Sequence, residues 1–286
     1  MEHVRCVLST VLNGKAMNKE YIPGNSYDGN QLFVVKGGRI AVKGQYDITN
    51  RRGIQIEHRG NVNVIEADVD NVEVEFSISQ VWKKHCSITT ITSIRIPKGK
   101  ILDAVDIDLP IFDILFDDVN AEIKELGIRA AEGDVAFDSK NLETDHIGID
   151  VNVGTIRGNY KTSRLSASTR VGDIDLNLEV FGKDAEIKTS VATGSSHLHV
   201  SKSHDTRNIK SKHVAYNGSI TLYYPKTWEG KVRAQTNVGR VSFSDQIQVT
   251  KQKSDVVKDD KEGLKGNGQS LLHVQTDVGE IVVDLE

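Results

Sequence analysis

Apolar and polar residues alternate along most of this chain, and the alternation predicts β-strands that each have one buried face. Residues 174–178 and 241–243 are two such runs. From Leu165 onward one pattern occurs five times: apolar, polar, apolar, polar, Thr or Ser, polar, Val, Gly, polar, apolar. Its clearest copies are residues 165–174, 232–241 and 272–281.

The glycine of this pattern recurs at a nearly constant interval. The pivotal glycines, at 133, 154, 172, 194, 218, 239 and 279, are 21, 18, 22, 24, 21 and 40 residues apart. A period of about 20 residues is typical of stacked arrays, in which each unit buries its apolar face against its neighbours. The sequence therefore predicts an all-β fold: a single-domain β-solenoid of stacked short strands, with rungs of about 20 residues.

The residues around each glycine predict how a rung closes. Glycine reaches positive φ without a Cβ penalty, so we expect it where the strand turns a corner. The Thr, Asn and Asp side chains beside it are expected to hydrogen-bond locally to the turn backbone.

Three further regions complete the predicted organisation. Residues 1–93 are expected to form a β-rich N-terminal cap with the first rungs, and residues 94–286 to form the repeats. Residues 119–131 include helix-forming side chains, but Gly127 interrupts them and no helical apolar stripe continues, so we interpret them as strand. Residues 251–270 are charge-dense and poor in apolar side chains, which predicts a flexible insertion.

Composition narrows the choice of partner. The 286 residues carry a net charge of −4, and no block of Lys and Arg with interleaved aromatics occurs, so we expect no nucleic-acid partner. No stretch is long enough to span a membrane, and residues 6–12, which follow Glu2, make a poor signal peptide. The two cysteines, Cys6 and Cys86, cannot form a disulfide framework, which favours an intracellular, reducing compartment.

One set of motifs resembles a known family. Ile96-Pro97-Lys98-Gly99, followed by short strands and then by Thr-x-Val-Gly-x-Ile rungs, is similar to the putative adhesin family, whose domain is a β-solenoid of unknown function found in bacteria and fungi. The resemblance covers roughly residue 94 to the C-terminus. It implies the fold strongly and adhesion weakly, because members often carry a secretion signal or membrane anchor and neither is evident here.

Histidines and aspartates are the first candidates for chemistry. His197 and His199 share one face of a predicted strand, with His204 and His213 downstream, but no third ligand has the spacing of a zinc or copper site. An acidic cluster could serve glycoside hydrolysis or calcium binding, but a solvated outer face is the preferred interpretation, because strand alternation predicts charged residues there. Its members are Asp103, Asp106, Asp108, Asp113, Asp117 and Asp118, and Asp173 and Asp175 allow the same interpretations.

Two other groups complete the candidates. Trp82 and Trp228, with Tyr223 and Tyr224, could form a carbohydrate-stacking platform, or could pack at a cap or edge. His85 and Cys86 are adjacent, so on a strand they point to opposite faces and cannot act as a base and nucleophile.

The sequence therefore assigns no catalytic, cofactor-binding or metal-ligating residue. It predicts a non-enzymatic binding or scaffold domain with a protein or glycan partner, because no complete catalytic motif is present. The alternatives are a polysaccharide-active enzyme that uses carboxylates in 103–118, and a structural protein that polymerises end to end.

Overall fold

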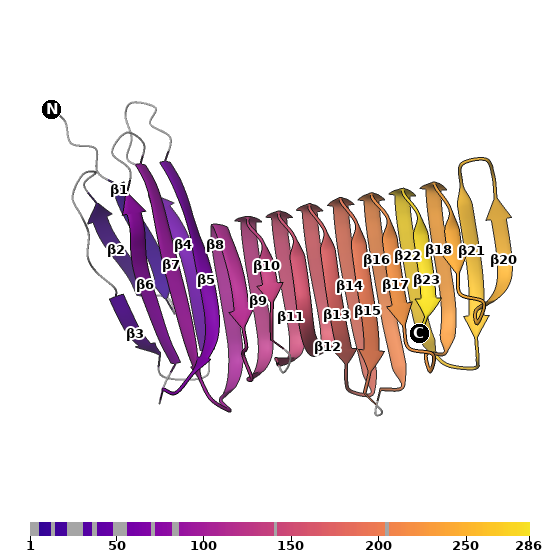
Figure 1. The fold of residues 1–286 in the computed structure, drawn as a ribbon, viewed down its shortest axis with the longest axis horizontal. Coiled ribbons are helices and arrows are strands. Elements are labelled where there is room, and N and C mark those ends of the chain that lie inside the picture. Colours follow the sequence, from indigo (N-terminus) through magenta and orange to yellow (C-terminus); the bar gives the residue numbers. More distant parts are fainter. Residues whose placement is uncertain are drawn as a thin grey trace. The chain divides into compact units, whose positions relative to one another are not determined.

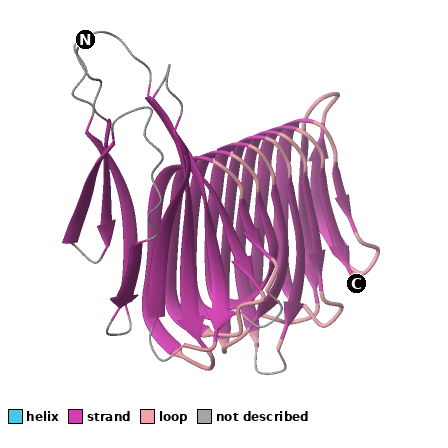
Figure 2. Cartoon of the chain, turned by 60° about the vertical axis from the view of Figure 1, so that its left-hand side comes forward, coloured by secondary structure: helices cyan, strands magenta, loops and turns pink. Residues whose placement is uncertain are grey.

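The computed structural model describes residues 6–12, 15–21, 31–35, 39–47, 56–69, 72–81, 86–139, 142–203 and 206–286. Every regular element in these ranges is a β-strand (Figures 1 and 2). The predicted all-β class is confirmed, and residues 122–132 are strand rather than helix. The chain divides into two compact units, Met1–Leu142 and Glu143–Glu286, where the sequence predicts a single domain. The boundary expected at residue 93 falls inside a strand.

The described residues of unit 1 form ten strands. They are β1 (Cys6–Leu12), β2 (Lys15–Tyr21), β3 (Gln31–Val35), β4 (Arg39–Asp47), β5 (Ile56–Ala67), β6 (Val72–Val81), β7 (Cys86–Pro97), β8 (Ile101–Asp117), β9 (Glu122–Glu132) and β10 (Val135–Phe137).

The strands of unit 1 form parallel sets that are extended by antiparallel strands. β4, β8 and β9 pair in parallel, and β1 and β2 continue this set in antiparallel pairs. β7, β5, the C-terminal part of β8 and β10 form a second parallel set, continued by antiparallel β6 and β3. Alternate residues of β8 are buried, as a strand with one core-facing side requires.

Unit 2 contains thirteen strands. They are β11 (Glu143–Val153), β12 (Ile156–Val171), β13 (Ile174–Val180), β14 (Asp184–Thr193), β15 (Ser196–Lys202), β16 (Asn208–Asn217), β17 (Ile220–Tyr224), β18 (Gly230–Val238), β19 (Val241–Phe243), β20 (Gln248–Ser254), β21 (Asp259–Lys265), β22 (Ser270–Val278) and β23 (Ile281–Leu285).

These strands form two parallel ladders in unbroken register (Figure 1). Ladder 1 contains, in spatial order, β11, the C-terminal part of β12, β14, β16, β22 and β18. Ladder 2 contains the N-terminal part of β12, then β13, β15, β17, β23 and β19. The spatial order departs from chain order at one place, because β22 and β23 lie between the β16–β17 pair and the β18–β19 pair.

A glycine turn joins each ladder 1 strand to the ladder 2 strand that follows it. These glycines have positive φ, as predicted, and those at 172, 194, 218, 239 and 279 are packed on the turn of the neighbouring strand pair. A Cβ added to Gly194 would lie 2.0 Å from the carbonyl oxygen of Gly172, and one on Gly172 would lie 2.1 Å from that of Gly154. The close approach of successive backbones therefore requires glycine as strictly as the turn conformation does.

The sequence suggested that the motif's threonine, two residues before the Val-Gly pair, bonds within its own turn. The structure shows a different acceptor. Thr169 Oγ1 donates to the carbonyl of Gly154 (2.9 Å), and Thr276 Oγ1 to that of Gly218 (2.9 Å). Thr236 Oγ1 donates to the carbonyl of Gly279 (3.0 Å). In each case the acceptor belongs to the adjacent strand pair, so the motif joins neighbouring turns to one another.

The core of unit 2 lies between the inward faces of the two ladders. It is filled by Val, Ile, Leu and Ala side chains, among them Leu176, Ile187 and Leu222. One buried polar cluster joins the ladders: the Tyr224 hydroxyl of ladder 2 donates to Ser211 Oγ of ladder 1 (2.7 Å), and His213 lies between Tyr224 and Thr189.

Residues 251–270, for which the sequence predicts a flexible insertion, contain strands. Most of β20 and all of β21 fall in this segment; the two strands pair antiparallel, and β21 pairs antiparallel with β18. The segment thus adds two strands beyond β18 rather than forming a structureless loop.

Candidate functional site

The outward face of ladder 1 is hollowed over β12, β14, β16 and β22. The hollow has a volume of about 470 Å³. It forms because Ser166, Ser168 and Ser190 are short, whereas Lys188, Lys212 and Tyr216 beside them are long and exposed. Gln275 and Asp277 of β22 complete its polar lining. Tyr216 is 58% exposed, so its ring is available to a ligand.

Basic side chains line up beside this hollow because the ladder is in register. One row across the strands contains Arg164, Glu186, Lys210, Leu271 and Lys231. The row two residues further along contains Ser166, Lys188, Lys212, His273 and Arg233. The basic face is defined here as Arg164, Lys188, Lys210, Lys212, Lys231 and Arg233, all of which are exposed.

Two titratable groups report the positive charge of this face. The pKa of Glu186 is lowered, chiefly by a hydrogen bond from Lys188 and further by the charges of Lys188, Arg164 and Lys210. The pKa of His273 is lowered by burial first, and then by the charges of Arg233 and Lys212. Both shifts have the sign expected beside excess cations, which favour carboxylate and disfavour imidazolium.

Acidic side chains offset part of this charge at two points. Glu186 lies 2.5 Å from Lys188, and Arg233 lies 3.8 Å from Asp260 and 3.9 Å from Glu262 of β21. None of the ion pairs among the described residues involves Arg164, Lys210 or Lys212. The middle of the basic face therefore keeps its cations available.

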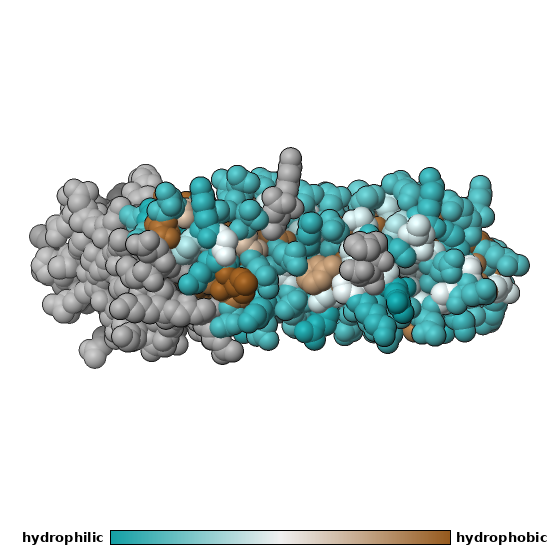
Figure 3. Space-filling view, turned by 90° about the horizontal axis from the view of Figure 1, so that it is seen from below, coloured by the Kyte–Doolittle hydropathy of each residue, from teal (hydrophilic) through white to brown (hydrophobic). Residues whose placement is uncertain are grey.

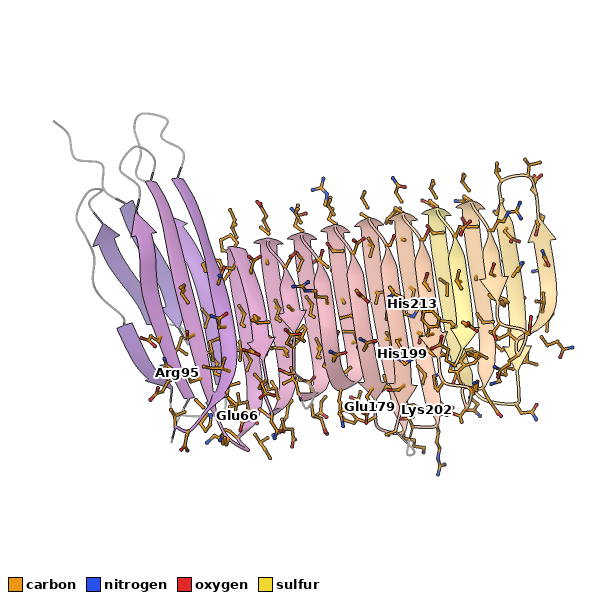
Figure 4. The ribbon with its side chains drawn as sticks, viewed as in Figure 1. Glu66, Arg95, Glu179, His199, Lys202 and His213 are labelled. Carbon is orange, nitrogen blue, oxygen red and sulfur yellow. The ribbon has the colours of Figure 1, made fainter. Side chains whose placement is uncertain are left out.

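The predicted histidine pair lies on the other ladder. His197 and His199 both point outward from β15; Figure 4 labels His199. His197 Nδ1 lies 3.2 Å from Asp175 Oδ1, and His199 Nε2 lies 3.5 Å from Glu286 Oε2. The ring of Tyr223 contacts both imidazoles, with centroids 5.5 and 6.3 Å apart.

The other two histidines do not join this pair. His213 is fully buried between the ladders, and His204 lies outside the described residues. In the part of the chain that the structure describes, no group of three or more His, Cys, Asp and Glu side chains could hold a metal ion.

The predicted acidic cluster is spread over turns and an outward face of unit 1. Asp103 forms an ion pair with Lys124 (2.8 Å), and Asp113 Oδ1 accepts the backbone N–H of Asp134 (2.9 Å). Asp173 has the equivalent role in unit 2, where it accepts the N–H of Ser195 (2.7 Å). Asp118 has φ of 47° and occupies a turn. Asp103, Asp113 and Asp173 thus stabilise turns or pair with a neighbouring strand, and no member of the cluster lines the hollow.

Two members of the predicted aromatic platform are not available to a ligand. Trp228 and Tyr224 are buried, with ring centroids 6.0 Å apart, and only Tyr223 reaches the surface. Trp82 and His85 lie outside the described residues, as does the side chain of Cys86.

The residues that line the hollow were missed by sequence reasoning. Tyr216 and Lys188 occupy outward positions of the two weaker copies of the motif, residues 214–222 and 187–194, and Lys210 and Lys212 precede the first of these. Aligning the copies by their glycines would have put these side chains in shared rows. The signal was present, but it appears only when outward positions are compared between copies instead of along the chain.

The arrangement is that of an all-β protein with a polar, cationic outer face. Side chains of the described residues on the face drawn in Figure 3 are likewise mostly hydrophilic. No helix in the described ranges is long and apolar enough to cross a membrane.

The chain is similar to several solved structures described as putative adhesins, and part of it matches the model of a family of unknown function. The model of a family described as Domain of unknown function (DUF7330) matches residues 130–267. The structure is similar to a putative adhesin from Bacteroides fragilis, with a TM-score of 0.43, 11% identity and coverage of 89% of this chain and 95% of that chain.

Two further solved structures have the same kind of description. A putative cell adhesion protein from Clostridium sporogenes has a TM-score of 0.25 and 11% identity, and covers 90% of this chain and 99% of its own. A putative adhesin from Parabacteroides merdae has a TM-score of 0.27 and 8% identity, with coverage of 90% and 96%. Among curated proteins no sequence matches.

Proposed function

We propose that this chain is a non-enzymatic binding domain of β-solenoid architecture, and that its ligand occupies the hollow on the outward face of ladder 1. The observation that carries the proposal is the hollow itself, about 470 Å³ in volume and lined by hydroxyl, amide and ammonium groups and one carboxylate beside an exposed tyrosine. Such a lining offers hydrogen bonds and one flat apolar surface, which together suit a glycan.

The in-register ladders support the solenoid architecture. Each rung has one ladder 1 strand, a glycine turn and one ladder 2 strand, and it pairs in parallel with its neighbours on both ladders. Stacks of this kind present an extended and rigid surface, because each rung is held on two sides. A rigid surface loses little conformational entropy when a ligand binds.

The proposal is tested with a glycan array and two tyrosine variants of the full chain. Tyr216→Ala removes the ring beside the hollow and is expected to weaken binding about tenfold, a loss of ~1.4 kcal/mol. Tyr223→Ala, on the outward face of ladder 2, is the matched control and should bind as the unchanged chain does.

The result has a clear contrary outcome. If no glycan binds at micromolar concentration, or if both tyrosine variants bind as the unchanged chain does, the hollow is not the ligand site. Circular dichroism should show both variants folded, because exposed side chains contribute little to stability.

A further inference from the structure

We propose that the ligand of the basic face and hollow is a linear acidic polysaccharide that lies across the strands of ladder 1. This inference rests on the proposed function and adds the charge and direction of the ligand.

The spacing of the cations defines that direction. In the row of Arg164, Lys210 and Lys231, the three side chains belong to β12, β16 and β18, which are every second strand of the spatial order. Neighbouring strands lie about 4.8 Å apart, so these cations recur at about 9.6 Å. A disaccharide unit of an extended polysaccharide spans a comparable length. A polymer with one carboxylate per disaccharide can therefore place a charge beside each cation in turn.

The second row provides contacts between these points. Lys188 and Lys212 are in register on adjacent strands and border the hollow. Lys212 has no acidic partner among the described ion pairs, and it lies close enough to lower the pKa of His273 together with Arg233. The two rows together place six basic side chains on β12, β14, β16 and β18, which would attract an anionic chain from solution.

The lining of the hollow distinguishes a polysaccharide from other polyanions. Ser166, Ser168, Ser190 and Gln275 present hydroxyl and amide groups, which match sugar hydroxyls as both donors and acceptors. A single-stranded nucleic acid is bound through successive stacking aromatics, whereas Tyr216 is the one aromatic side chain that lines this hollow. An acidic peptide would need no row of hydroxyls.

The test measures binding of the purified full chain to a hyaluronan hexasaccharide, which carries one carboxylate per disaccharide. Chitohexaose is the neutral probe of equal length, and polyglutamate and single-stranded DNA are the other polyanions. We expect the acidic hexasaccharide to bind at least about tenfold more tightly than the neutral one, and to weaken as salt is raised from about 50 to about 500 mM.

A matched pair of double variants locates the contact. Lys210→Ser with Lys212→Ser is expected to weaken hyaluronan binding at least about tenfold. Lys251→Ser with Lys253→Ser removes two exposed lysines at the same spacing on β20 and should leave the affinity unchanged. All four positions are exposed, so neither double variant should unfold the chain.

Each outcome is decisive. If chitohexaose binds as tightly and depends on Tyr216, the binding function stands and the acidic ligand is overturned. Equal affinity for polyglutamate or DNA would show that the face binds polyanions in general, and the proposal of a polysaccharide ligand would be overturned. If no probe binds, the acidic ligand is overturned, whereas the glycan-binding function fails only if the glycan array also detects no ligand.

Discussion

At the scale of single residues, the turn glycines of unit 2 are fixed by their neighbours as well as by their own φ. Gly194 has φ of 132°, and the carbonyl of Gly172 occupies the place where a Cβ would stand, 2.0 Å away. Backbone atoms cannot move aside without breaking the bond from Gly172 N–H to the carbonyl of Thr193. A side chain at this position would therefore disturb two strand pairs at once.

We predict that Gly194→Ala lowers the free energy of unfolding by about 3 kcal/mol or more, because it combines a strained φ with a backbone clash. Gly148→Ala is the matched control, since a Cβ there would meet nothing within 4 Å. Urea denaturation followed by circular dichroism measures both. Equal stability of the two variants would mean that the turns are looser than the structure shows.

His213 is the second residue whose surroundings have a measurable effect. It is fully buried, and burial lowers its pKa from 6.5 to about 3. Its ring nitrogens lie 2.9 Å from Thr189 Oγ1 and 3.2 Å from the Tyr224 hydroxyl, and Tyr224 is the one titratable group among its hydrogen-bond partners. Burial raises the pKa of that phenol, so the phenol stays neutral too. The cluster is stable only as an uncharged network.

We predict that unit 2 loses stability as the pH falls below 6.5. The unfolded chain then binds a proton at His213 and the folded chain does not, so the full stability exists above 6.5 and declines towards pH 3, by up to ~1.4 kcal/mol per pH unit. Urea denaturation between about pH 7.5 and pH 5 should show this slope, reduced in His213→Gln and kept in His197→Gln. An unchanged slope in His213→Gln would assign the pH dependence to other groups.

At the scale of elements, the β20–β21 hairpin covers strands that would otherwise end the ladders. β21 pairs with β18, while its Asp259 Oδ2 accepts the N–H of Val241 in β19 (3.0 Å). Lys261 Nζ donates to the backbone carbonyl of Val241. The side chains of Asp259 and Lys261 thus satisfy backbone groups of β19 with which a strand of another chain could otherwise pair.

We predict that Asp259→Ala exposes the edge of β19. Burial acts to raise the pKa of Asp259, but the hydrogen bonds from Ser254 and Val241 and the charge and hydrogen bond of Lys261 together lower it, so the carboxylate is the stabilising form. Its loss leaves the N–H of Val241 without its acceptor and should cost about 1–3 kcal/mol. Analytical ultracentrifugation should then show association that grows with protein concentration. A monomeric variant of unchanged stability would show that this contact protects nothing.

The same hairpin shows where sequence patterns stop being informative. Alternation identifies a strand when its buried positions are apolar. In β21 the buried positions are Asp259 and Gly263, and every residue of β20 is exposed, so neither strand has an apolar stripe. Charge density alone suggested a loop, although hydrogen bonds to β18 and β19 form the strands. Only the tertiary partners could have revealed them.

At the scale of the whole molecule, the sequence predicted the strands and turns better than their order. The all-β class, the glycine corners and the strand at 122–132 follow from local pattern, because each depends on a few neighbouring residues. The basic face and hollow depend on the register between strands that are distant in sequence. That register can be derived from the glycine spacing only by aligning the copies of the motif with one another. The 40-residue gap between Gly239 and Gly279 suggested an insertion. It is also the place where the order of the strands in space departs from their order along the chain.

That change in order has a consequence for how the chain folds during synthesis. β18 and β19 emerge from the ribosome before β22 and β23, yet each reaches the earlier strands only through these later ones. Rungs up to β17 can dock one after another as they emerge, whereas everything after residue 225 must wait for residues 270–285. This end of unit 2 therefore folds as one closing step of long-range contacts, and slow closure prolongs the exposure of unpaired edges.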